Sequence, residues 1–281
     1  METRTKIRAI AIDLDGTVLR NDSTLSDRTA DALRACLKNG IELIICTGRS
    51  PTSAEKYRLV LGASGPMVFY NGATVIDVPD GKLLASTLLP RDCSETSVAI
   101  ARDLGLHFHA FLPGDRLVYE ENRPESESYH KRTGLNGELA DFDVLLKMGG
   151  PAEAGFIKCM YIAEPDQLDL VQKEIDQRLG TRVYSARSHR TFLEVMAPGV
   201  SKGRALALAL DLRGISRMET VAFGDAENDV PMLEYAGRSY AVANAVTHAR
   251  NVAYATIGSN EEDGVAVILE KILQNGGFSI D

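Results

Sequence analysis

Apolar and polar positions alternate in blocks along the chain. The stretch "IRAIAI" at positions 7–12 is a nearly continuous apolar run of strand length, as expected of a parallel strand covered on both faces. The next stretch, "SDRTADALRACLKNG", has apolar residues at helical spacing, with Ser26 as a candidate N-cap and Gly40 as a stop signal. A second apolar run, "IELIICTG", begins at Ile41. Strand, helix and strand joined by short links predict an α/β fold with a mostly parallel sheet.

The pattern changes between about residues 83 and 190. There, "LHFHAFLPGDRLVYE" predicts two strands joined by a Gly-Asp turn, and "RVYSA" and then "TFLEVM" predict two more. Helical stretches accompany these strands, and the acid-rich "ENRPESESYH" is expected to be a solvated loop. The simpler alternation resumes with "GRALALALDLRG" and "TVAFGD". We therefore expect a core formed by residues 1–82 and 191–281, with an α+β domain at 83–190 inserted into it.

The charge balance narrows the range of partners. The 281 residues carry a formal net charge of −8 and contain no basic run, so we expect neither nucleic acid nor an anionic membrane as a partner. No apolar stretch approaches the ~20 residues of a membrane span, and the N-terminus lacks the apolar centre of a signal peptide. The four cysteines are far apart, as expected of reduced, buried thiols in a cytoplasmic protein. The oligomeric state does not follow from the sequence.

Polar residues follow three of the predicted strands, in the sequences "DLDGT", "CTGR" and "GDAEND". The carboxyl ends of parallel strands lie along one edge of a sheet, where ligands bind. The residues expected at this edge are Asp13, Asp15, Thr47, Gly48, Asp225, Asn228 and Asp229. Two unit charges ~4 Å apart repel by about 4 kcal/mol at an effective dielectric constant of 20, so several acids in one cleft need protons or a bound cation. Oxygen ligands without histidine or cysteine favour Mg²⁺ over zinc.

This set of residues can support phosphoryl transfer. A Mg²⁺ ion held by acids usually keeps positions open for a substrate phosphate. Thr47, the Gly48 amide, Lys202 and the Asn228 amide can hold the phosphate oxygens. Asp13 can attack phosphorus as a nucleophile. Asp15 can protonate the leaving alkoxide and later deprotonate the attacking water.

The motifs "DLDGT", "TGR", "SKG" and "GDAENDVPML", in this order, resemble the four motifs of the haloacid-dehalogenase-like (HAD) phosphatases. The combination of "VFYNGA", "LEVMAPGVSKG" and "SNEEDGVA" is similar to the Cof-type branch, whose α+β cap (type IIB) lies between the second and third motifs. The resemblance spans nearly the whole chain. It implies a Rossmann-like core with an inserted cap, and a Mg²⁺-dependent hydrolase of small phosphorylated metabolites, such as sugar phosphates, that forms an aspartyl-phosphate.

The resemblance also implies a role for each matching residue. Asp13 would be nucleophile and metal ligand, Asp15 the acid and base with its backbone carbonyl on the metal, and Asp225 the third protein ligand. Asp229 would support Lys202 or a metal-bound water. The phosphoryl group would be held by the Leu14 amide, Thr47, Gly48, Lys202 and Asn228. Ala226 and Ala243 depart from the usual residues of the branch, which leaves the local loop shape open but removes no catalytic group.

Some alternatives remain open from the sequence. A phosphomutase would use the same two aspartates, and a non-catalytic sugar-phosphate sensor could share the fold. Arg49 could steer phosphate or form an ion pair. In the inserted domain, Arg187, His189 and Arg190 are candidates for contacts with an anionic substrate. His107 and His109 would share a strand face, but no further zinc ligands accompany them.

Overall fold

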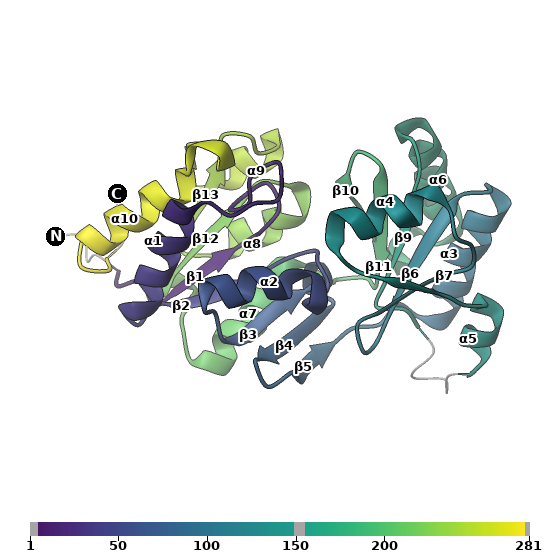
Figure 1. Ribbon diagram of the computed structural model, residues 1–281, viewed down its shortest axis with the longest axis horizontal. Coiled ribbons are helices and arrows are strands. Elements are labelled where there is room, and N and C mark those ends of the chain that lie inside the picture. The colour runs from purple at the N-terminus through teal and green to yellow at the C-terminus, as the bar shows by residue number, and fades with distance from the viewer. Residues whose placement is uncertain (1–4, 149–154, 279–281) are drawn as a thin grey trace. The chain divides into compact units, whose positions relative to one another are not determined.

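The computed structural model describes residues 5–148 and 155–278, which form two compact units (Figure 1). The first unit comprises residues 1–49, 54–85 and 201–281, and the second comprises residues 50–53 and 86–200. Each unit contains both helices and strands, and the first is built on a parallel sheet. The predicted α/β class is therefore confirmed.

The main sheet of the first unit has five parallel strands in the order β14-β13-β12-β1-β2. Strand β1 pairs with β12 on one side and with β2 on the other, and Ile10 and Ile12 in β1 have no exposed surface. A strand buried on both faces needs a continuous apolar run, which explains the composition of this segment. The strand bounds are Ala9–Ile12 for β1, Glu42–Ile45 for β2, Thr220–Gly224 for β12, Arg238–Val242 for β13 and Ala255–Ile257 for β14.

In the first unit, α1 lies beside α10, and α8 packs against both α7 and α9 (Figure 1). The predicted start of α1 is confirmed, because the Ser26 Oγ accepts a hydrogen bond from the Thr29 amide at 3.1 Å. The helix bounds are Asp27–Lys38 for α1, Pro51–Leu61 for α2, Lys202–Arg213 for α7, Val230–Tyr235 for α8, Thr247–Val252 for α9 and Gly264–Gln274 for α10.

A second, three-stranded sheet in order β3-β4-β5 contains the segment "PMVFYNGATVI". This segment forms two antiparallel strands, β3 (Gly65–Phe69) and β4 (Thr74–Val78), joined by a turn at Tyr70–Gly72, and β5 (Lys82–Ser86) follows. The turn places Asn71 in the left-handed region with φ 57°, a conformation that asparagine adopts more readily than most residues.

The second unit is built on a six-stranded sheet in the order β10-β11-β9-β6-β7-β8. The predicted hairpin is present as antiparallel β6 and β7, and the last two predicted strands are β10 and β11. Because β11 pairs with both β9 and β10, the chain returns to the first unit at Ser201, ten residues later than the expected boundary at 191. The bounds are His107–Leu112 for β6, Arg116–Tyr119 for β7, Gly137–Leu139 for β8, Lys158–Ile162 for β9, Tyr184–His189 for β10 and Phe192–Met196 for β11.

The two faces of this sheet differ in chemistry. Phe108 and Ala110 in β6 join a hydrophobic core with helices α3 (Arg91–Asp103), α5 (Phe142–Met148) and α6 (Pro165–Arg178). Side chains alternate along a strand, so the opposite face carries His107, His109 and Phe111. An aromatic cluster therefore covers the face of β6 that points away from the core.

The segment "ENRPESESYH", expected as a solvated loop, instead contributes to helix α4 (Pro124–Thr133), so that expectation is wrong. Pro124 occupies the start of the helix, where a missing amide costs nothing, and Gly134 ends it in the left-handed conformation with φ 73°. Tyr129 is buried and packs edge-on against His109, with ring centroids 4.9 Å apart. One tyrosine rather than an apolar stripe anchors the helix, which is why the hydrophobic pattern does not show it.

All four cysteines are buried and unpaired, as predicted. None of the helices within residues 5–148 and 155–278 combines the length and the apolar composition needed to cross a membrane.

A buried ion pair makes the second unit sensitive to single substitutions. Lys158 Nζ in β9 donates to Glu194 Oε1 in β11 at 2.8 Å, with side chains 2% and 5% exposed. We predict that Glu194→Leu destabilises this unit by about 3–5 kcal/mol, because a buried ammonium loses its counter-charge. Adding Lys158→Met should recover most of the loss. Hydrogen exchange of the β9 amides measures both, and equal loss in the single and double variants would contradict the prediction.

Candidate active site

The carboxyl ends of β1, β2 and β12 lie next to one another and bring together acids from distant parts of the sequence. Asp13 directly follows β1, and Asp225 directly follows β12. Between them, Gly16 has φ 80°, and a Cβ atom at this position would lie 2.5 Å from Asp225 Oδ2. Glycine is therefore required on both conformational and steric grounds. The sequence "DLDG" allows the chain to turn tightly beside a second acid.

Lys202, at the start of α7, lies between two of the acids. Its Nζ donates to Asp13 Oδ1 and to Asp229 Oδ1, each at 2.5 Å, and Lys202 and Asp229 have no exposed surface. The other oxygen of Asp229 accepts hydrogen bonds from the amides of Asp225 at 2.9 Å and Ala226 at 3.0 Å. Asp229 thus fixes both the lysine and the loop after β12. The contact from Ala226 uses its backbone amide, so an alanine side chain at this position does not prevent it.

The close packing of acids shifts their pKa values. Burial raises the pKa of Asp13 well above its ordinary value, Lys202 opposes this, and the charges of Asp229, Asp225 and Asp15 add to it. Burial and then the charge of Asp229 raise the pKa of Asp225 to about 7, although Thr17 Oγ1 donates to its carboxylate at 2.9 Å. Burial alone would lower the pKa of Lys202, but Asp13 and Asp229 raise it above its ordinary value. The site carries more negative charge than one lysine balances.

A divalent cation can supply the missing charge. Asp13, Asp225 and Asp229 each present a carboxylate oxygen within 4.8 Å of the others. Among the described residues, one oxygen of Asp13 and one of Asp225 make no hydrogen bond, whereas both oxygens of Asp229 are already engaged. The donor set therefore fits a hard metal ion with Asp13 and Asp225 as ligands and Asp229 as support.

Asp15 pairs with Arg49, which is one of the two roles that the sequence left open for this arginine. Arg49 Nε donates to Asp15 Oδ2 at 2.7 Å, and Arg49 Nη2 donates to Asp15 Oδ1 at 2.6 Å. The arginine side chain is 7% exposed and lies over the Tyr57 ring at 5.0 Å, whereas the Asp15 side chain is 43% exposed. A bidentate pair of this kind fixes the plane of the carboxylate.

The expected phosphate-binding residues line the same edge, with one addition. Asn228 Nδ2 donates to Asn71 Oδ1 at 2.8 Å, and the Asn71 amide donates to the Thr47 carbonyl at 3.0 Å. A Cβ atom on Gly48 would lie 2.8 Å from Asn71 Oδ1, so this glycine allows the approach. Asn71 and Thr17 were missed as site residues. The sequence signal for Asn71 is the "NG" pair directly after a strand, which is typical of a tight turn.

The three cap candidates belong to the second unit and differ in their partners. Arg187 donates to Asp169 at 2.6 Å, and Arg190 donates to Glu164 at 3.1 Å. His189 lies 2.9 Å from the Thr191 hydroxyl and lines a cavity. Their role in selecting a substrate stays a prediction.

An acid cluster beside a buried lysine at the carboxyl edge of a parallel α/β sheet is suited to an enzyme that transfers or hydrolyses phosphoryl groups. Comparison with known proteins supports this interpretation of the site. The chain belongs to the haloacid dehalogenase-like hydrolase family, whose model matches residues 10–269. Together with the phosphatase names of its relatives, this makes the protein a phosphatase of that family.

Three similar proteins cover nearly the whole chain. A Streptococcus pyogenes serotype M6 protein named as a candidate phosphatase is 30% identical, over 96% of this chain and 99% of its own. The 5-amino-6-(5-phospho-D-ribitylamino)uracil phosphatase of Bacillus subtilis is 28% identical, over 95% and 98%. The crystal structure of a haloacid dehalogenase-like hydrolase from Bacteroides thetaiotaomicron has a TM-score of 0.85 at 26% identity, covering 95% of this chain and all of that one.

The raised pKa of Asp225 predicts a specific pH dependence of stability. A carboxyl whose pKa is higher in the folded state holds its proton there while the unfolded chain has lost it. Without metal, the free energy of unfolding should therefore fall by roughly 2–4 kcal/mol as pH rises from about 4 to about 7. Denaturant titration across this range measures the slope. In Asp225→Asn the slope should be smaller, and in the exposed control Asp211→Asn it should not change.

Added Mg²⁺ should restore the free energy of unfolding that is lost at higher pH, because the ionised acids would be its ligands. At a concentration of 100 times its Kd, a ligand specific for the folded state adds about 2.7 kcal/mol. We expect a clear rise in Tm with Mg²⁺ at pH 8 and a much smaller one at pH 5. An equal rise at both values would contradict the assignment of the acids.

Proposed function

We propose that the protein is a Mg²⁺-dependent phosphomonoester hydrolase that acts through an aspartyl-phosphate on Asp13. The observation that carries this proposal is the state of that carboxylate. Lys202 fixes one oxygen at 2.5 Å, while the other makes no hydrogen bond among the described residues. A buried, oriented carboxylate beside a cation is what an attack on phosphorus requires.

The reaction proceeds in two balanced steps. In the first, an Asp13 oxygen forms a bond to phosphorus, the bond from phosphorus to the ester oxygen breaks, and Asp15 gives its proton to the leaving alkoxide. In the second, water attacks the phosphorus of the aspartyl-phosphate, Asp15 takes the proton of the water, and inorganic phosphate leaves Asp13 as a carboxylate. The Leu14 amide, Thr47, Gly48, Lys202 and Asn228 hold the phosphoryl oxygens in both steps.

Asp13, the Asp15 carbonyl and Asp225 would hold the Mg²⁺ ion, which when bound neutralises phosphoryl charge. Proton transfer to the leaving group places a further requirement on Asp15. While both of its oxygens accept hydrogen bonds from Arg49, neither can donate a proton to a leaving group. The 43% exposed Asp15 side chain must turn away from the buried arginine for the first step. Arg49 is then a positioning residue that holds the acid at rest.

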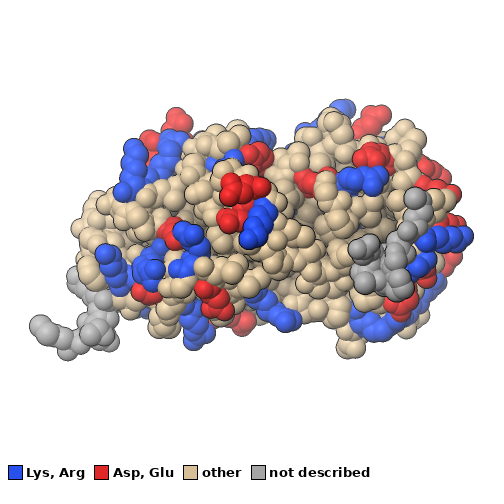
Figure 2. Space-filling view, turned by 90° about the horizontal axis from the view of Figure 1, so that it is seen from below, with Lys and Arg blue, Asp and Glu red and all other residues tan. Residues whose placement is uncertain are grey.

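The substrate is a small phosphorylated metabolite, for which sugar and sugar-alcohol phosphates are the best candidates. The relative from Bacillus subtilis is named for a substrate that carries a phosphate on a ribityl group. On the face drawn in Figure 2, Lys and Arg are interspersed with Asp and Glu rather than gathered into one basic surface, which suits a small ligand better than nucleic acid. A cytoplasmic location stays a prediction.

Asp13→Asn tests the nucleophile. The amide cannot form an acyl phosphate, so release of inorganic phosphate from sugar phosphates should fall by at least about 10³-fold. Wild-type release should also stop when a chelator removes divalent ions and return with Mg²⁺. Migration of phosphate to another sugar hydroxyl without release would favour a mutase, and tight binding without turnover would favour a sensor. Full turnover by the Asp13→Asn variant would refute the mechanism.

Arg49→Lys tests the positioning role. Lysine keeps the charge but cannot form the bidentate pair, so we expect kcat to fall about tenfold with KM nearly unchanged. Arg58→Lys is a matched control, because Arg58 makes the same fork with Glu55, at 2.6 Å for both contacts, away from the acids. A rise in KM with kcat unchanged would instead indicate that Arg49 binds substrate.

A further inference from the structure

The second unit contains a cavity of ≈440 Å³ between helix α4 and the aromatic face of the six-stranded sheet. This volume is within the range of small-molecule sites. Its lining includes His107 from β6, Glu125, Tyr129 and Arg132 from α4, His189 from β10 and Phe192 from β11. Apart from the prediction for His189, none of these residues has a role in the proposed hydrolysis.

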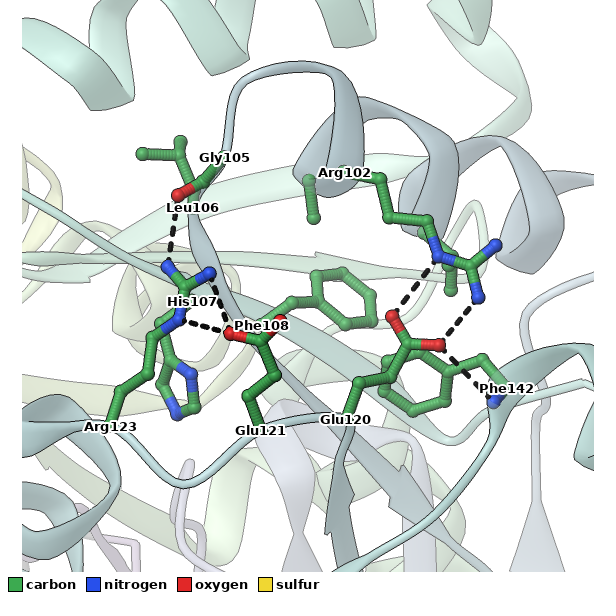
Figure 3. A pocket seen from close by; sticks show the side chains of 11 residues that line it. Arg102, Gly105, Leu106, His107, Phe108, Glu120, Glu121, Arg123 and Phe142 are labelled. Atoms are coloured by element: carbon green, nitrogen blue, oxygen red, sulfur yellow. Dashed lines mark hydrogen bonds and ion pairs between the residues drawn. The ribbon is translucent and has the colours of Figure 1, made fainter.

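In a neighbouring cavity of ≈180 Å³, the charged side chains pair with one another. In it, Arg102 pairs with Glu120 at 2.5 Å, and Arg123 pairs with Glu121 at 2.9 Å and with the Gly105 carbonyl at 2.9 Å (Figure 3). Glu120 also accepts from the Phe142 amide (Figure 3). The charged groups there satisfy one another, so that cavity offers little to a ligand.

The larger cavity is also lined by Arg123 and by Glu164, which pairs with Arg190, but two of its other charged groups lack such partners. Among the described residues, Arg132 forms no ion pair, and its guanidinium lies over the Phe192 ring at 5.4 Å. Glu125 likewise makes no hydrogen bond or ion pair within the described chain. One cation and one anion are therefore available beside two aromatic rings, with Tyr129 and Phe192 centroids 5.8 Å apart.

The His107 side chain adds an oriented donor. His107 Nε2 and His109 Nε2 are 2.9 Å apart, and burial lowers the pKa of both rings, so they share one hydrogen bond as neutral imidazoles. His109 Nδ1 is buried without a partner. If His107 donated, that atom would be a buried N–H without an acceptor, which is the rarer kind of unsatisfied group. His109 therefore donates, and His107 carries its own proton on Nδ1, which has no protein acceptor within the described residues.

We propose that this cavity binds a planar nitrogen heterocycle with both carbonyl and amino groups, of the kind found in pyrimidines. The ring packs against Tyr129 and Phe192, its acceptor atoms face the His107 N–H and the Arg132 guanidinium, and its amino group faces Glu125. The heterocycle is either part of the phosphorylated substrate or a separate effector. Binding itself does not depend on the proposed hydrolysis.

Titration of the full chain with cytosine and with uracil, followed by ligand-observed NMR, tests the proposal. We expect saturable binding of cytosine with a Kd of the order of 1 mM or tighter, weaker binding of uracil, which lacks the amino group, and none of myo-inositol, a non-planar polyol. Arg132→Gln and Phe192→Leu should each weaken binding about fivefold to tenfold. The matched control is Arg116→Gln, because Arg116 is an exposed arginine of the same unit that does not line the cavity and pairs with Glu138.

The effect of cytosine on hydrolysis of p-nitrophenyl phosphate distinguishes a heterocycle that is part of the substrate from one that is a separate effector. A rise in KM alone identifies a substrate subsite, and a change in kcat identifies an effector site; either supports the cavity. Absence of saturable binding, or equal affinity in all variants, overturns it. Phosphate release that persists without heterocycle binding would refute this proposal only, whereas binding without phosphate release would refute only the proposed hydrolysis.

Discussion

The buried contact of Lys202 with Asp13 and Asp229 is the interaction on which the catalytic end of the sheet depends. Removing an ammonium ion from water costs several kcal/mol, and two carboxylates at 2.5 Å offset this cost. The lysine in turn makes it possible to bury Asp13, which is 5% exposed. Because one lysine faces more than one acid, the balance of charge is incomplete. Burial and this deficit together raise the pKa of Asp225, and the deficit would favour a divalent cation between Asp13 and Asp225.

The same contact dictates the sequence of the loop after β12. Asp229 can hold Lys202 only if its backbone is close to the strand end, and a Cβ atom on Gly224 would lie 2.6 Å from the Asp229 Cβ. The second oxygen of Asp229 is then free to accept the two loop amides. The order of small residue and acids in "GDAEND" thus follows from packing around one ammonium group as well as from chemistry. For this reason, a motif of six residues is sufficient to predict the position of several site residues.

Features that depend on strand ends could be predicted from the sequence, and features that depend on side-chain partners could not. Apolar runs locate β1, β2 and β12, and parallel pairing then brings Asp13 and Asp225 together without further information. The Asp15–Arg49 pair joins residues 34 positions apart through side chains alone, so no periodicity indicates it. Helix α4 was missed because a single tyrosine anchors it. The sequence also did not show that β11 belongs to the second unit, because the residue pattern of a strand does not indicate which sheet it joins.

In the proposed mechanism, the two aspartates of "DLD" have opposite physical requirements, and their surroundings meet them. A nucleophile gains from being held still, because the entropy of its alignment is lost on folding rather than in the reaction. Asp13 is accordingly buried and tied to a lysine that itself has no freedom. An acid that later acts as a base must exchange protons with a leaving group and then with water, so it needs access to both. Asp15 is half-exposed and paired with one buried arginine, so its own side chain can reach solvent once that pair opens. Two positions along the chain are sufficient for this difference, because both residues lie beyond the end of β1, where the chain turns at Gly16 with φ 80° and strand alternation no longer holds.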